Sequence, residues 1–245
     1  MPQLPFQLAI AAAVVAGLSL ALPNIAPGVE FMAAEGSPIR LFFGVSEEMN
    51  LPTFLSVLIL VGTSGTLALA GRLAGGSVGV AIYVAAALVL GLAFDDFAAL
   101  HERLEVIGGL IAPDGFNGSG YVWVLPASVL AVGLLVAFWQ LVRRVNGRAR
   151  VYLLSGIVVF LGAAMGLETV NGYLDRPGTD GAPLQIVTHL EELVENLGII
   201  LVLRGALGML QVSRSAHGVS VRIDRRAVTG KPHATAEEDP ELVGT

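Results

Sequence analysis

Acidic and histidine side chains gather in three segments of the chain that are otherwise apolar. They are Asp95, Asp96, His101 and Glu102 in the first segment, Glu168 in the second, and His189, Glu191, Glu192 and Glu195 in the third. Carboxylate oxygens and imidazole nitrogens are ligands of zinc, iron and manganese in proteins. Several carboxylates in one apolar region require bound cations, shared protons or contact with solvent, because ionised carboxylates repel one another and are costly to remove from water. The three segments therefore predict a site for a cation.

The spacing within each segment suits an α-helix that directs several of these groups to one side. Asp95 and Glu102 are seven residues apart and share a helix face, and Glu191 and Glu195 are four apart. The stripes of the second and third segments also carry amides, at Asn171 and Asn196. Bundles of facing helices with carboxylate and histidine ligands hold di-iron and di-manganese centres, and a similar set suits zinc with a bound water.

Each residue receives a predicted role on this basis. The predicted ligands of a divalent metal ion (zinc, iron or manganese) are Asp95, His101, Glu102, Glu168, His189, Glu192 and Glu195. The predicted general bases or partners of the ligands are Asp96, Glu191 and Glu48, and the predicted hydrogen-bond partners behind them are Asn50, Asn171 and Asn196. Two of these residues also have a plainer interpretation: Asn50 before Pro52 is typical of a helix cap, and His189 at a membrane interface needs no ligand role.

The composition indicates which elements must position these residues. The chain has 245 residues, of which 54% are hydrophobic and 14% charged, and its mean hydropathy is +0.74. A soluble domain carries roughly a quarter charged residues, and a disordered chain is far less apolar. With a bilayer core about 30 Å thick requiring about 20 apolar residues per helix, six helices are predicted near residues 6–25, 52–71, 78–104, 121–142, 151–173 and 184–211.

The predicted fold is therefore all-α, an integral membrane six-helix bundle over residues 1–211. Residues 212–245 are polar and contain proline and glycine, so we expect a flexible cytoplasmic tail there. Gly162 and Gly166 are four residues apart in the fifth predicted helix, a spacing that permits close helix approach.

The charges predict how this bundle is oriented. Eleven of the 14 lysines and arginines fall on one side of the predicted helices and three on the other. Basic residues favour the cytoplasmic side, which predicts that both termini are cytoplasmic in the cell membrane. The three acidic segments then meet near the extracytoplasmic side.

Several motifs in these segments resemble those of an uncharacterised family of bacterial multipass membrane proteins. The matching motifs are Asn50-Leu51-Pro52-Thr53, Asp95-Asp96 followed by Leu100-His101-Glu102, Gly166-Leu167-Glu168, and Glu191-Glu192-x-x-Glu195 with Gly198. The resemblance spans predicted helices two to six, omits His189, and implies no particular activity. The chain is less similar to alkaline-ceramidase-like zinc hydrolases, which use three histidines where the membrane region here has two.

The expected function is that of a metal-dependent membrane enzyme. A hydrolase would use a metal-activated water with a carboxylate as base, and a di-metal oxidoreductase is the other enzymatic option. The expected partners are membrane lipid and a lipid-phase or periplasmic small molecule. The net charge of −6 and the lack of basic runs interleaved with aromatics argue against nucleic acid. A cation- or proton-coupled transporter and a non-catalytic membrane scaffold are the alternatives.

Overall fold

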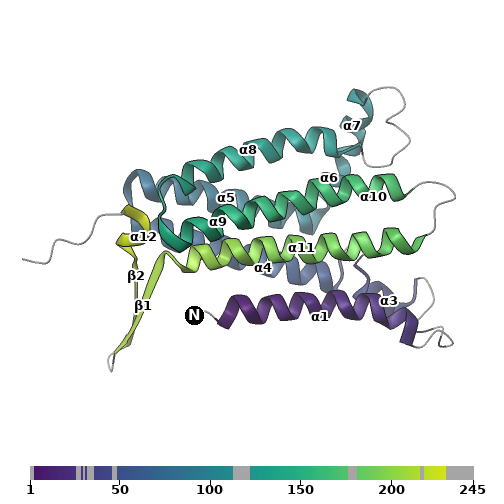
Figure 1. The fold of residues 1–245 in the computed structure, drawn as a ribbon, viewed down its shortest axis with the longest axis horizontal. Helices are drawn as coiled ribbons and strands as arrows, with labels where there is room; N and C mark the ends of the chain where they lie inside the picture. The colour runs from purple at the N-terminus through teal and green to yellow at the C-terminus, as the bar shows by residue number, and fades with distance from the viewer. Residues whose placement is uncertain are drawn as a thin grey trace, which may run out of the picture.

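The structure, a computed structural model, describes residues 3–25, 29, 31, 36–45, 49–112, 122–175, 181–215 and 218–229, and it is mostly helical (Figure 1). The long helices are α1 (Gln3–Ile25), α4 (Leu51–Ala74), α5 (Gly76–Ala98), α8 (Val124–Val142), α9 (Gly147–Leu161) and α11 (Gly181–Leu207). The helix that starts with α9 continues through a π-helical segment, η1 (Gly162–Leu167), into α10 (Glu168–Leu174). The short elements are α3 (Pro38–Phe43), α6 (Leu100–Arg103), α7 (Glu105–Ile111), α12 (Arg225–Thr229) and the strands β1 (Leu210–Ser215) and β2 (Gly218–Ile223).

Five helices of the described chain are long and apolar enough to cross a membrane: α1 over Gln3–Leu22, α4, α5, α8, and the continuous helix Gly147–Leu174. The fold is therefore that of a multipass membrane protein. The sixth predicted span exists as α11, which has 27 residues but carries three glutamates and Arg204. The count of six spans and the orientation of the termini stay predictions.

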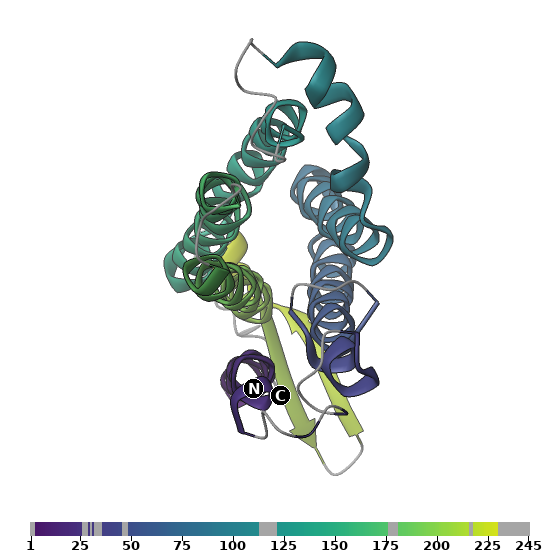
Figure 2. The ribbon, with the colours of Figure 1, turned by 90° about the vertical axis from the view of Figure 1, so that its right-hand side faces the viewer.

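The helices form two layers, which are visible when the bundle is viewed along its length (Figure 2). One layer contains α1, α11, α9–α10 and α8, and the other contains α4 and α5. Leu67, Ile82, Phe138 and Ile199 fill the space between the layers and are almost completely buried. Large apolar side chains such as Val129 also point outward, as expected for a surface that lipid covers.

Glycines bring α9 and α11 into backbone contact. A Cβ atom on Gly198 would lie 2.6 Å from the Phe160 backbone nitrogen, and a Cβ on Gly156 would lie 2.7 Å from the Gly198 carbonyl oxygen. The Gly162 and Gly166 spacing is not used for such a contact, because a Cβ at either would meet nothing within 4 Å. The pair lies in η1, and the close approach occurs at Gly156, six residues before Gly162.

The third predicted helix is not continuous to Leu104. Helix α5 ends at Ala98, and Ala99 adopts the left-handed conformation with φ of 47°, which ends the helix through a bond from its N–H to the Asp95 carbonyl. The chain resumes as α6, so Asp95 and Glu102 lie on two helices rather than on one face of a single helix.

The segment from residue 212 onward was predicted to be a flexible tail, and for residues 212–215 and 218–229 this is wrong. The strands β1 and β2 form an antiparallel hairpin in which Leu210 pairs with Ile223. Alternating apolar residues suit such a hairpin. The short helix α12 follows, with Val228 buried and the Ala227 carbonyl accepting a hydrogen bond from the Asn146 N–H. Residues 230–245 lie outside the described chain.

Replacing Gly198 with alanine should force α9 and α11 apart, since the atoms that the new methyl group meets are backbone atoms. We expect a loss of about 1–3 kcal/mol, typical of overpacking in a tight contact, measured as a lower unfolding temperature by tryptophan fluorescence in detergent. Gly162→Ala, which meets no atom, is the control. Equal unfolding temperatures for the two variants would contradict the proposed contact.

Candidate functional site: an acidic cluster at one end of the bundle

The three acidic segments lie at the same end of the bundle, where α5 ends, α10 runs and α11 begins (Figure 1). We call the carboxyl groups of Asp95, Asp96, Glu168, Glu191, Glu192 and Glu195 the acidic cluster. The structure thus brings together six of the predicted side chains from three helices that are far apart in sequence.

Glu191 is the most deeply buried acid of the cluster. Its side chain is 7% exposed, and the Asn171 amide donates a 2.5 Å hydrogen bond to its Oε2 atom. The Glu168 carboxyl lies next to it, within hydrogen-bonding range. Because Glu168 and Asn171 lie three residues apart on α10, that one helix presents both groups to α11.

Asn171 itself has an unused hydrogen-bonding atom. The residue is 2% exposed, and its Oδ1 atom is buried and accepts no hydrogen bond from the described residues. A buried amide oxygen without a donor costs free energy, about 1–3 kcal/mol. This atom is therefore positioned to receive a proton donor or a cation.

Aromatic and histidine side chains connect the cluster to α8 and α6. The Trp123 indole N–H donates to Glu168 Oε1 at 3.1 Å, and the His101 ring packs on Trp123 with centroids 4.9 Å apart. The Nδ1 atom of His101 lies 3.2 Å from Asp95 Oδ2, and both side chains are about one-third exposed. His101 thus supports Asp95 at the outer edge of the cluster.

Negative charge is concentrated around Glu195. Four other carboxyl groups lie within electrostatic range of it, namely those of Glu192, Asp96, Glu168 and Asp95. Among the residues that the structure describes, no arginine or lysine forms an ion pair with Glu168, Glu191 or Glu195. Neutralisation of these carboxylates therefore has to come from protons, solvent or a bound cation.

The structure places His189 away from the cluster, in a contact between α11 and α1. Its Nδ1 lies 2.6 Å from the Gln185 carbonyl and therefore donates, which leaves Nε2 as the acceptor of the Ser19 hydroxyl at 2.9 Å. Ser19 in turn accepts from the Val45 N–H at 3.1 Å. Both ring nitrogens are engaged, so this arrangement leaves no ligand role for His189.

Two predicted amides, Asn196 and Asn50, have structural partners outside the acidic cluster. Asn196 exchanges hydrogen bonds with the Ser56 hydroxyl of α4 at 3.0 and 3.2 Å. Asn50 caps α4, because its Oδ1 accepts from the Thr53 N–H and hydroxyl, both at 3.0 Å. Asn50 also donates to the Gly44 carbonyl. The interpretation of Asn50 as a helix cap is confirmed.

No three histidine or acidic side chains of the described residues surround one point at distances that would hold a metal ion. Two predicted residues do not enter this comparison, since Glu48 and the side chain of Glu102 lie outside the described part of the chain. A cation at Glu168 and Glu191 would need a further oxygen, and the Asn171 Oδ1 atom supplies one of the right chemistry.

Sequence reasoning missed Trp123, Ser19 and Ser56. Each contacts a predicted residue from a distant helix, and the separations along the chain are 45, 170 and 140 residues. Neither a tryptophan just before a helix nor a serine in an apolar helix gives any sign of its partner in the sequence. Only the packing of the helices reveals these contacts.

A family model matches residues 7–209, from α1 to the end of α11, and it describes a domain of unknown function, DUF8692. Comparison with curated proteins and with solved structures gave no match.

Ser19→Ala should loosen α1 from the bundle, because it leaves both the Val45 N–H and His189 Nε2 without their partner. Removing one partner of a buried hydrogen bond costs about 1–3 kcal/mol, so the unfolding temperature in detergent should fall. Ser155→Ala is the control, since among the described residues the Ser155 hydroxyl bonds to the Tyr152 carbonyl of its own helix and to no other helix. A Ser19 variant as stable as the control would refute this role.

Proposed function

The chain belongs to the DUF8692 family, whose description assigns no activity, and we propose from its acidic cluster that it is a cation-binding integral membrane protein. The cation is a divalent metal ion that Glu168, Glu191 and the Asn171 Oδ1 atom hold. The site opens toward the extracytoplasmic side and serves a metal-dependent reaction on a lipid-phase or periplasmic-side substrate.

The observation that carries this proposal is the Asn171 amide beside two carboxyl groups. Its oxygen is buried without a donor in the described chain, and its nitrogen donates to Glu191. The adjacent carboxyls of Glu168 and Glu191 have no basic partner among the described residues. One bound cation would neutralise both carboxylates and would bind the amide oxygen. Its binding would therefore remove both the free-energy cost of unpaired carboxylates and that of an amide oxygen without a partner.

In this proposal the exposure of each side chain decides whether it acts as a ligand or as a proton carrier. Glu191 is too deeply buried to meet a substrate directly and acts as a ligand, whereas Asp95 and His101 are partly exposed. The Asp95–His101 pair is therefore the better candidate for moving a proton to or from solvent. The cation would act as a Lewis acid toward a polar group of the substrate.

Proton- or cation-coupled transport is the second candidate, and the closeness of the Glu168 and Glu191 carboxyls favours it. Two adjacent carboxyls can share one proton, and such intramembrane acids are working parts of coupled transporters. A metal ion would displace that proton, so the two candidates differ in what occupies the same pair of side chains.

Metal analysis of the detergent-purified protein tests the proposal. We expect about one equivalent of zinc, iron or manganese per chain by mass spectrometry, and a loss of most of it in Glu168→Gln and Glu191→Gln, which keep the size of the side chain but remove the charge. Glu105→Gln is the matched control, because Glu105 is an exposed acid at the same end of the bundle.

Sub-stoichiometric metal in the wild type, or the same metal content in all three variants, would overturn the metal site. Uptake into vesicles that depends on a proton gradient and is lost in Glu191→Gln would then support the transporter. His189→Gln should keep its metal, since the His189 ring is occupied by Ser19 and Gln185.

The orientation has a separate test. A green fluorescent protein fused after Thr245 should fluoresce, and alkaline phosphatase fused after residue 178, between α10 and α11, should be active, since that enzyme works only outside the cytoplasm. The excess of basic residues at the other end of the helices is the physical reason. The reverse result for both reporters would place the acidic cluster on the cytoplasmic side.

A further inference from the structure

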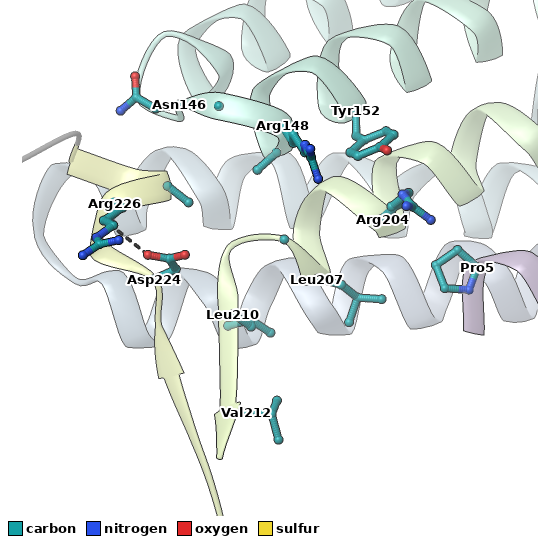
Figure 3. A pocket seen from close by; sticks show the side chains of 14 residues that line it. Pro5, Asn146, Arg148, Tyr152, Arg204, Leu207, Leu210, Val212, Asp224 and Arg226 are labelled. Atoms are coloured by element: carbon teal, nitrogen blue, oxygen red, sulfur yellow. Dashed lines mark hydrogen bonds between the residues drawn. The ribbon is translucent and has the colours of Figure 1, made fainter. Parts of the chain in front are cut away.

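A cavity of about 590 Å³ lies at the end of the bundle opposite to the acidic cluster. The start of α9, the end of α11 and the hairpin with α12 surround it, and Pro5 of α1 closes one side (Figure 3). Three arginines line this cavity, and each comes from a different helix: Arg148 from α9, Arg204 from α11 and Arg226 from α12. We call it the arginine cavity.

The described residues that line the cavity include three arginines and one acid, so the cavity keeps an excess of positive charge. Within the residues that the structure describes, Arg148, Arg204 and Arg226 form no ion pair with a carboxylate. The lining includes one acid, Asp224, and its Oδ1 atom accepts a 3.0 Å hydrogen bond from the Arg226 backbone N–H at the start of α12 (Figure 3). Arg148 and Arg204 lie on the other side of the cavity from Asp224 (Figure 3), and their positive charges favour an anion there.

One of the guanidinium groups is held in place by an aromatic ring. The Arg204 guanidinium lies 4.8 Å from the centroid of the Tyr152 ring. This cation–π contact fixes the orientation of the guanidinium but does not neutralise its charge. Its N–H groups can therefore still bind an anion. A fixed arginine loses less side-chain entropy when it binds a phosphate through two parallel hydrogen bonds.

One wall of the cavity is apolar. Pro5, Leu207, Leu210 and Val212 line the side that faces α1 and β1 (Figure 3). The cavity also lies where membrane-crossing helices begin or end, since α1 starts at Gln3 and α9 at Gly147. A ligand with an anionic head and an apolar body would contact the arginines with its head and the apolar wall with its body, at the ends of the membrane-crossing helices.

We propose that the arginine cavity binds the phosphate group of an anionic ligand, and that its source is an anionic phospholipid. Arg148 and Arg204 contact the phosphate oxygens, Arg226 adds positive charge on the far side of the cavity, and the apolar wall contacts the start of the acyl chains. This inference concerns the opposite end of the molecule from the cation site, and it holds whatever the cation site does.

Native mass spectrometry of the full-length protein in detergent tests this site. The probes are dioleoylphosphatidylglycerol, which carries a net negative charge, and dioleoylphosphatidylcholine, whose phosphate is neutralised by its own choline. We expect preferential binding of phosphatidylglycerol, and a loss of about tenfold or more in affinity in Arg148→Gln/Arg204→Gln, because bidentate phosphate contacts are lost. Arg204→Lys should fall between the wild type and this variant.

The matched control is Arg214→Gln/Arg222→Gln, which removes two positive charges from exposed positions in the hairpin. Its affinity for phosphatidylglycerol should fall by about twofold or less, since screening reduces the effect of distant surface charges. Equal losses in the two double variants would overturn the proposal and would leave only general attraction to the basic surface. Equal binding of the two lipids would also overturn it.

A third probe distinguishes the source of the phosphate. Glycerol 3-phosphate carries the phosphate without acyl chains, and competition by it for phosphatidylglycerol at equal concentration would reject a lipid and support a soluble phosphate ligand. If Arg148→Gln/Arg204→Gln does not fold, the single variant Arg148→Gln provides the comparison from α9. Unchanged lipid affinity in Arg148→Gln and Arg204→Lys would contradict the arginine contacts.

Discussion

The contact between α9 and α11 is the constraint on which the rest of the structure depends. Gly156 and Gly198 allow the two backbones to touch, and a Cβ at either would meet backbone atoms. Without a hydrophobic driving force between helices in lipid, such close van der Waals packing is a main source of helix association. The same interface continues in both directions. It places Glu168 and Asn171 against Glu191 at one end, and Tyr152 against Arg204 at the other.

The two ends of this interface carry opposite charges that the described chain does not cancel. Glu191 and Arg204 lie on the same helix, 13 residues and therefore about 20 Å apart. Across that distance neither charge can neutralise the other, because screening and solvent weaken the interaction. Each end has to obtain its counter-charge from elsewhere. For this reason both proposals concern a charged ligand, and each proposal can be tested without the other.

Hydropathy and helical spacing were sufficient to predict where the apolar helices lie and that the acids of α5, α10 and α11 gather at one end. They could not predict the direction in which individual side chains point, because that depends on helix breaks and on contacts between distant helices. Ala99 ends α5, so Asp95 and Glu102 do not share one helix face, and His101 instead reaches Asp95 from α6. The η1 segment precedes Glu168, and its wider turn shifts the direction of Glu168 relative to Gly156 from the value that 3.6 residues per turn gives. The role of His189 depended on Ser19, 170 residues away, which no periodicity reveals.

The position of α11 explains how a membrane protein tolerates so many polar groups on one helix. Helix α11 packs against α1, α4, α9 and α10, so its sides face protein in several directions rather than lipid. Each polar side chain uses a different neighbour: His189 bonds Ser19 of α1, Asn196 bonds Ser56 of α4, and Glu191 accepts from Asn171 of α10. Interhelical hydrogen bonds of this kind are modest individually, about 0.6 kcal/mol on average. Their main effect is to fix the rotation of α11, which in turn fixes the direction in which Glu191 and Glu195 point.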